Sequence, residues 1–181
     1  MLPELHLTDW RATKDTLHLY CQVIGKIRLA TTAPRNHWWN VPLYVDVRGL
    51  TTRRLHHAGT TFDIALDFVD HAVVVRTADG RREAFALHEG LDVAAFDRRL
   101  HAALAGLGID VEIRELPFGV PMTTPFPSDH EHAAWDREHA GAGVRPRATD
   151  QGLVAQATGL GRGVGVEGGV AEVVVAGPES E

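Results

Sequence analysis

The stretch TFDIALDFVDHAVVVRTADGRREAFAL, residues 61–87, decides the fold of this chain. Its first third places Phe62, Ile64 and Leu66 at every second position, with polar or small residues between them. A side-chain period of two is that of a strand with one buried and one exposed face. The sequence therefore predicts a strand that lays its apolar side chains on a core.

Two further strands follow within the same stretch. Residues 69–71 suit a tight turn, and they lead into an apolar run at 72–77. Asp79-Gly80 is a strong signal for a hairpin turn, with another strand predicted at 83–87. Strands joined by turns this short pair antiparallel, so the stretch predicts a meander.

The same alternation upstream predicts a fourth strand of this antiparallel meander, with a helix before it. Residues 41–48 place Leu43 and Val45 on one face and polar side chains on the other, which faces either solvent or a polar cover. Before this strand, Asp9 can cap a helix that runs over about residues 10–29.

A second helix and a fifth strand follow the meander. Asp92 is a good N-cap, and apolar residues recur at helical spacing as far as Leu107, where Gly108 suits the end of the helix. Residues 111–115 alternate again, and a short helix or turn is predicted at 128–139. This order predicts an α+β fold: an antiparallel sheet of about five strands with two main helices packed on one face.

The chain changes composition at residue 141. Residues 141–181 contain ten glycines and no aromatic residue, histidine or lysine, whereas all 12 aromatic residues and all 11 histidines precede them. A segment so poor in bulky groups buries little apolar area. We therefore expect one α+β domain over 1–140 and a flexible Gly-rich, low-complexity tail over 141–181, either a genuine extension or a frameshifted translation. Residues 170–176 would add a short strand if they met a free sheet edge.

Composition argues against several classes of function. The net charge of −6 disfavours binding to a nucleic-acid backbone, which needs a basic surface. No apolar run approaches the roughly 20 residues of a membrane span, and the N-terminus does not resemble a signal peptide. Cys21 is the only cysteine, so no intrachain disulfide is possible. We expect a cytoplasmic protein without nucleic-acid or membrane partners, and the sequence leaves its oligomeric state open.

The densest cluster of ionisable residues lies at 129–139. If this segment is helical, four of its side chains share one face: Asp129, His132, Asp136 and His139. Two imidazoles and two carboxylates on one face could bind a divalent metal such as Zn²⁺, Mn²⁺ or Fe²⁺. The alternative is a capping aspartate followed by a solvated polar helix.

A second candidate site combines the first helix with the loop after it. The helix carries a polar stripe with one residue every four positions and an arginine beside it: Lys14, His18, Gln22, Lys26 and Arg28. The stripe either faces solvent or lines a site for phosphate or carboxylate near His37. In that loop His37 and Trp39 would wall a ligand pocket, or the tryptophan would simply pack on the helix.

Arg48 opens a loop over 48–54 that combines a glycine and two threonines with three arginines. This loop could hold an anion, or it is a solvated connection between strands. It matches no glycine-rich consensus for phosphate binding, so the motif alone does not decide between the two.

Several of these residues also carry a resemblance to a known family. The motifs are Gly25-Lys26-Ile27-Arg28-Leu29, Asn36-His37-x-Trp39, Arg48-Gly49-Leu50-Thr51-Thr52, Asp67-Phe68-x-x-His71 and Asp129-x-x-His132-x-x-x-Asp136. Over roughly residues 5–140 the chain resembles a bacterial family of unknown function, domain of unknown function 5996. The resemblance implies a cytosolic α+β protein. It also marks candidates for a shared ligand-binding site: His18, Gln22, Lys26, Arg28, His37, Trp39 and Arg48.

The chain departs from the family pattern in three places. Arg53-Arg54 stands where a serine and an apolar stretch would be usual, and His139 stands where an aromatic residue would be usual. Family members then continue with an aromatic-rich helix and a closing segment resembling Ser-Pro-x-His-Phe-Phe-Trp-Gly, and 141–181 contains neither. A site that depends on that closing segment would be incomplete here.

Three functions follow from the sequence. The first is a module that binds a small anionic metabolite through the stripe and the loops described above. The second is a metal-dependent hydrolase, in which the cluster at 129–139 holds a divalent metal that activates water. The third is a structural protein that binds a partner through the open face of the sheet.

Overall fold

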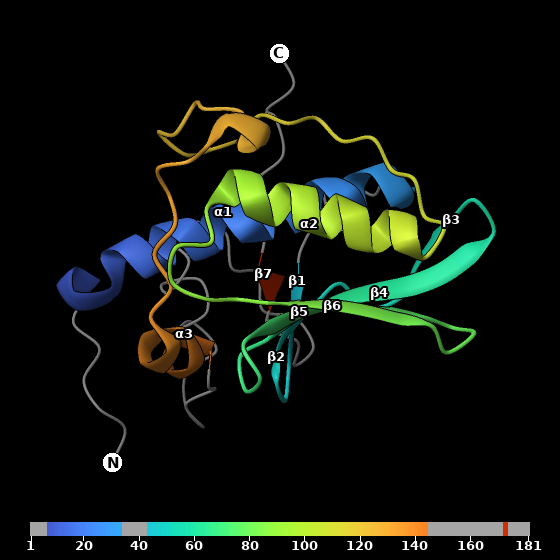
Figure 1. The fold of residues 1–181 in the computed structure, drawn as a ribbon, viewed down its shortest axis with the longest axis horizontal. Coiled ribbons are helices and arrows are strands. Elements are labelled where there is room, and N and C mark those ends of the chain that lie inside the picture. Colours follow the sequence, from blue (N-terminus) through green and yellow to red (C-terminus); the bar gives the residue numbers. More distant parts are fainter. Residues whose placement is uncertain (1–6, 34–42, 145–171, 174–181) are drawn as a thin grey trace.

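The computed structural model describes residues 7–33, 43–144 and 172–173, which form an α+β fold (Figure 1). The helices in this part of the chain are α1 (Leu7–Thr31), α2 (Val93–Gly106), the 3-10 helix η2 (Phe126–Ser128) and α3 (Arg137–Val144). The strands are β1 (Leu43–Asp46), β2 (Gly49–Thr51), β3 (Leu55–His57), β4 (Thr60–Asp67), β5 (Ala72–Thr77), β6 (Arg82–Ala86) and β7 (Glu172–Val173). The predicted fold class is confirmed.

The strands of the described residues form one antiparallel sheet. Its order is β6-β5-β4-β2-β1-β7, and β3 also pairs with β4. β4, β5 and β6 are three of the four strands of the predicted meander, and in them Ile64 lies opposite Val75 and Leu66 opposite Val73. These four side chains are almost completely buried, so the period of two identified the face that packs on the core.

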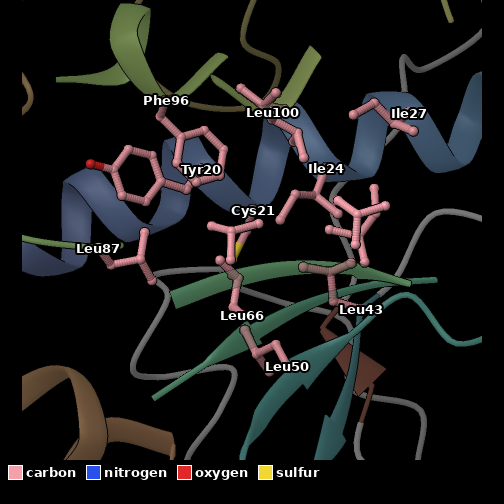
Figure 2. Close-up of a cluster of buried hydrophobic side chains, with 14 of the residues drawn as sticks. Tyr20, Cys21, Ile24, Ile27, Leu43, Leu50, Leu66, Leu87, Phe96 and Leu100 are labelled. Atoms are coloured by element: carbon pink, nitrogen blue, oxygen red, sulfur yellow. The ribbon is translucent and has the colours of Figure 1, made fainter. Parts of the chain in front are cut away.

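The two long helices, α1 and α2, lie side by side on this face of the sheet (Figure 1). Figure 2 shows the rings of Tyr20 and Phe96 stacked between them, with ring centroids 3.9 Å apart. The Tyr20 hydroxyl donates to the carbonyl of Leu91, which satisfies its polar atom. Burial raises the pKa of the Cys21 thiol to about 12, so Cys21 stays protonated and packs as a small apolar residue.

The opposite face of the sheet carries ion pairs between neighbouring strands. Arg76 of β5 bonds Asp63 of β4, with Nε 3.0 Å from Oδ1. In the turn after β1, Arg48 bonds Asp67 through Nε at 2.6 Å and Asp70 through Nη2 at 2.7 Å. The polar cover that the sequence left open is therefore supplied partly by these pairs. Exposed pairs of this kind contribute little to the stability of the fold.

Two predictions about the strands are wrong in detail. Residues 41–48 are not one strand, because β1 ends at Asp46 and the chain turns at Val47, which is 94% exposed. β2 then returns beside β1. Residues 111–115 form no strand, although Val111 is buried. A sequence of alternating apolar and polar residues indicates only that every second side chain is buried. Such side chains can be buried by packing on the core, without pairing to another strand.

The strand expected within residues 170–176 is confirmed. Glu172 lies opposite Tyr44 and Val173 opposite Leu43, so β7 pairs antiparallel with β1. The other residues of the predicted tail beyond Val144 lie outside the described residues.

The backbone amides in the first turn of α2 donate hydrogen bonds to two kinds of acceptor, a capping side chain and carbonyl groups of a distant segment. Asp92, the predicted N-cap, accepts from the Ala95 amide at 2.6 Å. The amides of Val93 and Ala94 donate instead to carbonyl groups of the segment 129–133. Since the first amides of a helix have no partner within it, this distant segment completes the start of α2.

Replacing Asp92 by alanine is expected to lower the free energy of unfolding by about 1 kcal/mol, because the Ala95 amide loses its cap. Urea denaturation measures the change. Asp110→Ala removes an exposed aspartate beyond the helix and serves as the control. Equal unfolding midpoints for the two variants would show that the cap contributes nothing.

Candidate functional site

His18, Gln22 and Lys26 form a row along α1, and this row faces the loop after α2. Gln22 is 1% exposed, and its side-chain amide bonds the backbone of Phe118 twice. Nε2 donates to the Phe118 carbonyl at 2.9 Å, and Oε1 accepts from the Phe118 amide at 2.8 Å. The interpretation of the stripe as an ordinary solvated surface is therefore wrong for His18 and Gln22.

His18 is buried, and its ring is neutral at neutral pH. Its Nε2 lies 3.4 Å from Nε2 of Gln22. Burial lowers the pKa of His18 to about 4, the positive charge of Lys14 lowers it as well, and Asp15 opposes both. A neutral imidazole contributes no charge to anion binding, so His18 is not a cationic ligand at pH 7.

Lys26 ends the row with a half-buried ammonium. The ammonium lies over the Phe118 ring, 5.9 Å from its centroid. Burial lowers the pKa of Lys26, and so does the positive charge of Arg114. No carboxylate of the described residues pairs with this ammonium.

Arg28 points to a different side of α1, as its spacing of two residues from Lys26 requires. Its Nη1 donates to the carbonyl of Thr52, and its guanidinium lies 5.1 Å from the centroid of the Tyr44 ring. The Arg53 guanidinium lies 3.9 Å from the same centroid. Two guanidinium groups therefore converge on Tyr44, and we call these three residues the Tyr44 cluster.

Arg53 reaches Tyr44 because the chain is interrupted between β2 and β3. Thr52 still pairs with β4, since its amide donates to the Ile64 carbonyl at 2.9 Å and its Oγ1 accepts from the Ile64 amide at 2.9 Å. Arg53 then adopts a φ of 55°, in the left-handed region that residues with a Cβ avoid. Interruptions of this kind re-aim side chains, and this one directs Arg53 onto the ring.

Of the other predicted ligand-binding residues, those that the structure describes lie outside the Tyr44 cluster. Tyr44 pairs with Thr51 at the open end of the β1–β2 hairpin, whereas Arg48 lies in its turn and bonds two aspartates. His37 and Trp39 lie outside the described residues. The predicted single site is thus divided among the row beneath Phe118, the Tyr44 cluster and the hairpin turn.

Of the short helix or turn predicted over 128–139, the continuous helix does not form, so the four predicted metal ligands share no helix face. η2 ends at Ser128 and α3 begins only at Arg137. Between them Asp129 accepts hydrogen bonds from two amides that follow it, at 3.1 Å each. Asp136 does the same at the start of α3. Aspartate side chains compete for backbone amides in this way, which favours turns and caps over a continuous helix.

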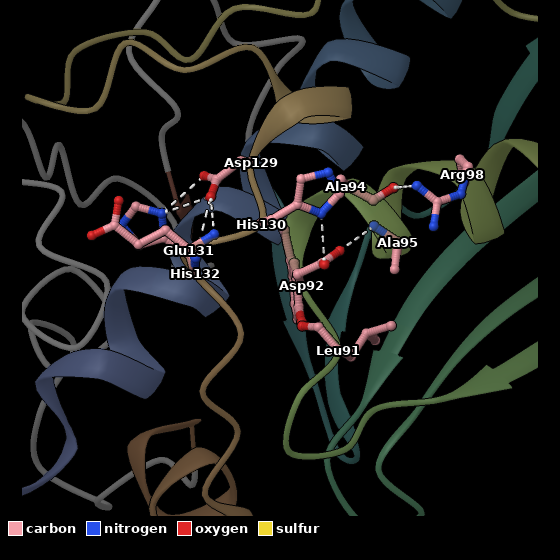
Figure 3. Close-up of polar contacts among 10 residues, drawn as sticks. Leu91, Asp92, Ala94, Ala95, Arg98, Asp129, His130, Glu131 and His132 are labelled. Carbon is pink, nitrogen blue, oxygen red and sulfur yellow. Dashed lines mark hydrogen bonds and ion pairs between the residues drawn. The ribbon is translucent and has the colours of Figure 1, made fainter.

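Each of these aspartates pairs with one histidine instead. Nδ1 of His132 lies 2.9 Å from Oδ2 of Asp129, beside the start of α2 (Figure 3). Nδ1 of His139 lies 2.8 Å from Oδ2 of Asp136. Within the residues that the structure describes, no three histidine, cysteine, aspartate or glutamate side chains are grouped so as to hold a metal ion.

Sequence reasoning missed Tyr44, Phe118 and Arg114 as site residues, and it noted Arg53 only as part of the loop 48–54. Alternation placed Tyr44 on the polar face of its strand, but it gave no indication of which cations lie over the ring. Two consecutive arginines after a strand were the available signal. The signal could not tell which of Arg53 and Arg54 lies over the Tyr44 ring.

The comparisons with known proteins identify the family and nothing narrower. The chain matches no curated protein and no solved structure. None of the helices in the described residues is long and apolar enough to cross a membrane. The model of a family of unknown function, DUF5996, matches residues 2–148. Since this match covers most of the 181 residues, the chain belongs to the DUF5996 family of unknown function.

Proposed function

We propose that this chain is a binding module for small anionic molecules, and that the Tyr44 cluster recognises the anion. The observation that carries the proposal is the convergence of two positive charges on one ring, at 5.1 Å for Arg28 and 3.9 Å for Arg53. Two cations in one place attract an anion more strongly than either does alone, even in a chain of net negative charge.

The surroundings of Arg53 support this role. Arg53 is exposed, and no carboxylate of the described residues pairs with its guanidinium. A guanidinium that lies over an aromatic ring keeps its N–H groups available for paired hydrogen bonds to carboxylate or phosphate. Arg53 would therefore bind an anion without first breaking a salt bridge.

The backbone of Arg53 supports the same role. A residue with a Cβ in the left-handed region costs about 1–2 kcal/mol, whereas glycine adopts it freely. The chain nevertheless carries an arginine at this position. Backbone strain of this kind gathers at ligand-binding sites, where the side chain contributes more than the strain costs.

The test is a thermal unfolding series with glucose 6-phosphate, AMP, citrate and succinate as probes. At about 100 times its dissociation constant, a bound anion adds about 2.7 kcal/mol of stability, which raises the melting temperature by roughly 5–10 °C. We expect at least one probe to give such a shift with the wild-type chain.

The matched variants are Arg53→Gln and Arg54→Gln, which remove neighbouring exposed arginines. Loss of a charged hydrogen-bond donor should weaken probe binding by about 10- to 100-fold in Arg53→Gln. Arg54→Gln should leave it nearly unchanged, because Arg54 does not lie over Tyr44. The proposal fails if no probe shifts the wild-type chain, or if both variants respond alike.

A further inference from the structure

The guanidinium group of Arg53 has one face against Tyr44 and the other toward solvent. Its central carbon, Cζ, lies 3.9 Å from the centroid of the Tyr44 ring. An atom in the plane of the ring would be held further away by the ring edge, so this distance places the guanidinium over the ring face, in van der Waals contact with it. Arg53 is exposed, and within the described residues nothing forms a hydrogen bond or ion pair with its guanidinium. The outward face is therefore available to a ligand.

Arg28, the other cation of the Tyr44 cluster, is placed differently. It is 5% exposed, and its Nη1 donates to the carbonyl of Thr52. Its guanidinium lies 5.1 Å from the ring centroid. Arg28 therefore contributes positive charge from within the protein, whereas Arg53 presents a flat surface to the solvent.

Hydrogen bonds hold the backbone of Arg53 in place. Its amide donates to Oγ1 of Thr51 at 3.0 Å, and its carbonyl accepts from Oγ1 of Thr52 at 2.8 Å. Thr51 itself lies opposite Tyr44 in the β1–β2 ladder. A group that is ordered before binding loses less freedom when a ligand arrives, so the flat surface of Arg53 is preorganised for stacking.

We propose that the anion bound by the Tyr44 cluster is a phosphate that carries a planar aromatic base, of the nucleoside monophosphate class, which presupposes the anion binding proposed above. The base stacks on the outward face of the Arg53 guanidinium, so that Tyr44, Arg53 and the base form three layers. The N–H groups of a guanidinium lie in its own plane and stay available for the phosphate oxygens. An anion without a ring would use those N–H groups alone and leave the outward face in water.

The experiment compares three probes by isothermal titration calorimetry on the full chain: AMP, ribose 5-phosphate and adenosine. Ribose 5-phosphate has the phosphate without the base, and adenosine has the base without the phosphate. We expect AMP to bind about tenfold more tightly than ribose 5-phosphate, because only AMP stacks on Arg53. Adenosine should also bind more weakly than AMP, because it lacks the charged hydrogen-bond acceptors.

The decisive variant is Arg53→Lys, with Arg54→Lys as its matched control. Arg53→Lys keeps the positive charge and the side-chain Cβ at a φ of 55°, but it loses the planar group. The ratio of the dissociation constants of ribose 5-phosphate and AMP should fall from about ten toward one in this variant. Arg54→Lys should retain the wild-type ratio, because Arg54 does not lie over Tyr44.

The possible failures are distinguishable. If AMP and ribose 5-phosphate bind the wild-type chain equally well, the base is not recognised, and this inference is overturned while anion binding stands. A preference for AMP that persists in Arg53→Lys would place the base elsewhere and overturn the inference as well. If neither phosphate binds, this inference falls together with the proposed function.

Discussion

Gly49→Ala is expected to cost about 4 kcal/mol or more of unfolding free energy, which is an exceptional loss for one methyl group. A Cβ at this position would lie 2.0 Å from the carbonyl oxygen of Leu66 and 2.8 Å from Cδ2 of Phe68. The first contact is with backbone inside the β2–β4 ladder, where Gly49 lies opposite Asp67. The methyl group can be accommodated only if β2 moves away from the centre of the sheet, and φ of 155° adds strain.

Gly59→Ala is the matched control for this prediction. Gly59 has a φ of 83°, but a Cβ there would meet nothing within 4 Å. Its substitution should therefore cost only the backbone strain, about 1–2 kcal/mol. Urea unfolding followed by circular dichroism compares the two midpoints. If Gly49→Ala unfolds at the same midpoint as Gly59→Ala, then β2 and β4 do not approach as closely as described here.

Acidification from pH 6.5 to 4 is expected to remove about 3 kcal/mol of stability through His18 alone. Burial lowers the pKa of this histidine from 6.5 to about 4 in the folded chain. Between these two values the unfolded chain binds a proton at His18 and the folded chain does not. The unfolding free energy therefore falls as the pH falls through this window, and the loss levels off only below pH 4.

The difference between the wild-type chain and His18→Gln isolates this effect from other titrating groups. The variant should show a flatter dependence of unfolding free energy on pH between 6.5 and 4. His56→Gln, which removes an exposed histidine of β3 that lies 3.0 Å from the Thr61 hydroxyl, serves as the control. Parallel curves for wild type and His18→Gln would contradict a neutral, buried ring.

The meander could be predicted because local patterns and tertiary packing agree there. Alternation in β4 and β5 matches the face that α1 and α2 cover, and Asp79-Gly80 matches the hairpin turn. At 111–115 the same alternation failed, since Val111 fills the core beside the helices rather than in the sheet. A sequence pattern of this kind specifies burial, while pairing depends on which strand edge is within reach.

The site was harder to predict than the fold, for reasons seen at individual residues. The spacing of Asp129 and His132 fits a helix face, yet the aspartate bonds the amides that a helix would use. Lys26 and Arg28 are close in sequence but lie on different sides of α1, over different rings. Arg53 lies over Tyr44 because its backbone adopts a positive φ, and the sequence pattern gives no sign of this conformation.

The hydrogen bonds at the start of α2 also set an order of events during synthesis. A ribosome delivers α2 before residues 129–133, whose carbonyl groups accept from Val93 and Ala94. Until those residues emerge, the amides of Val93 and Ala94 can bond only water. A nascent chain that ends before this segment therefore carries α2 with an incomplete start, and the helical layer reaches its final form only after most of the chain has been translated.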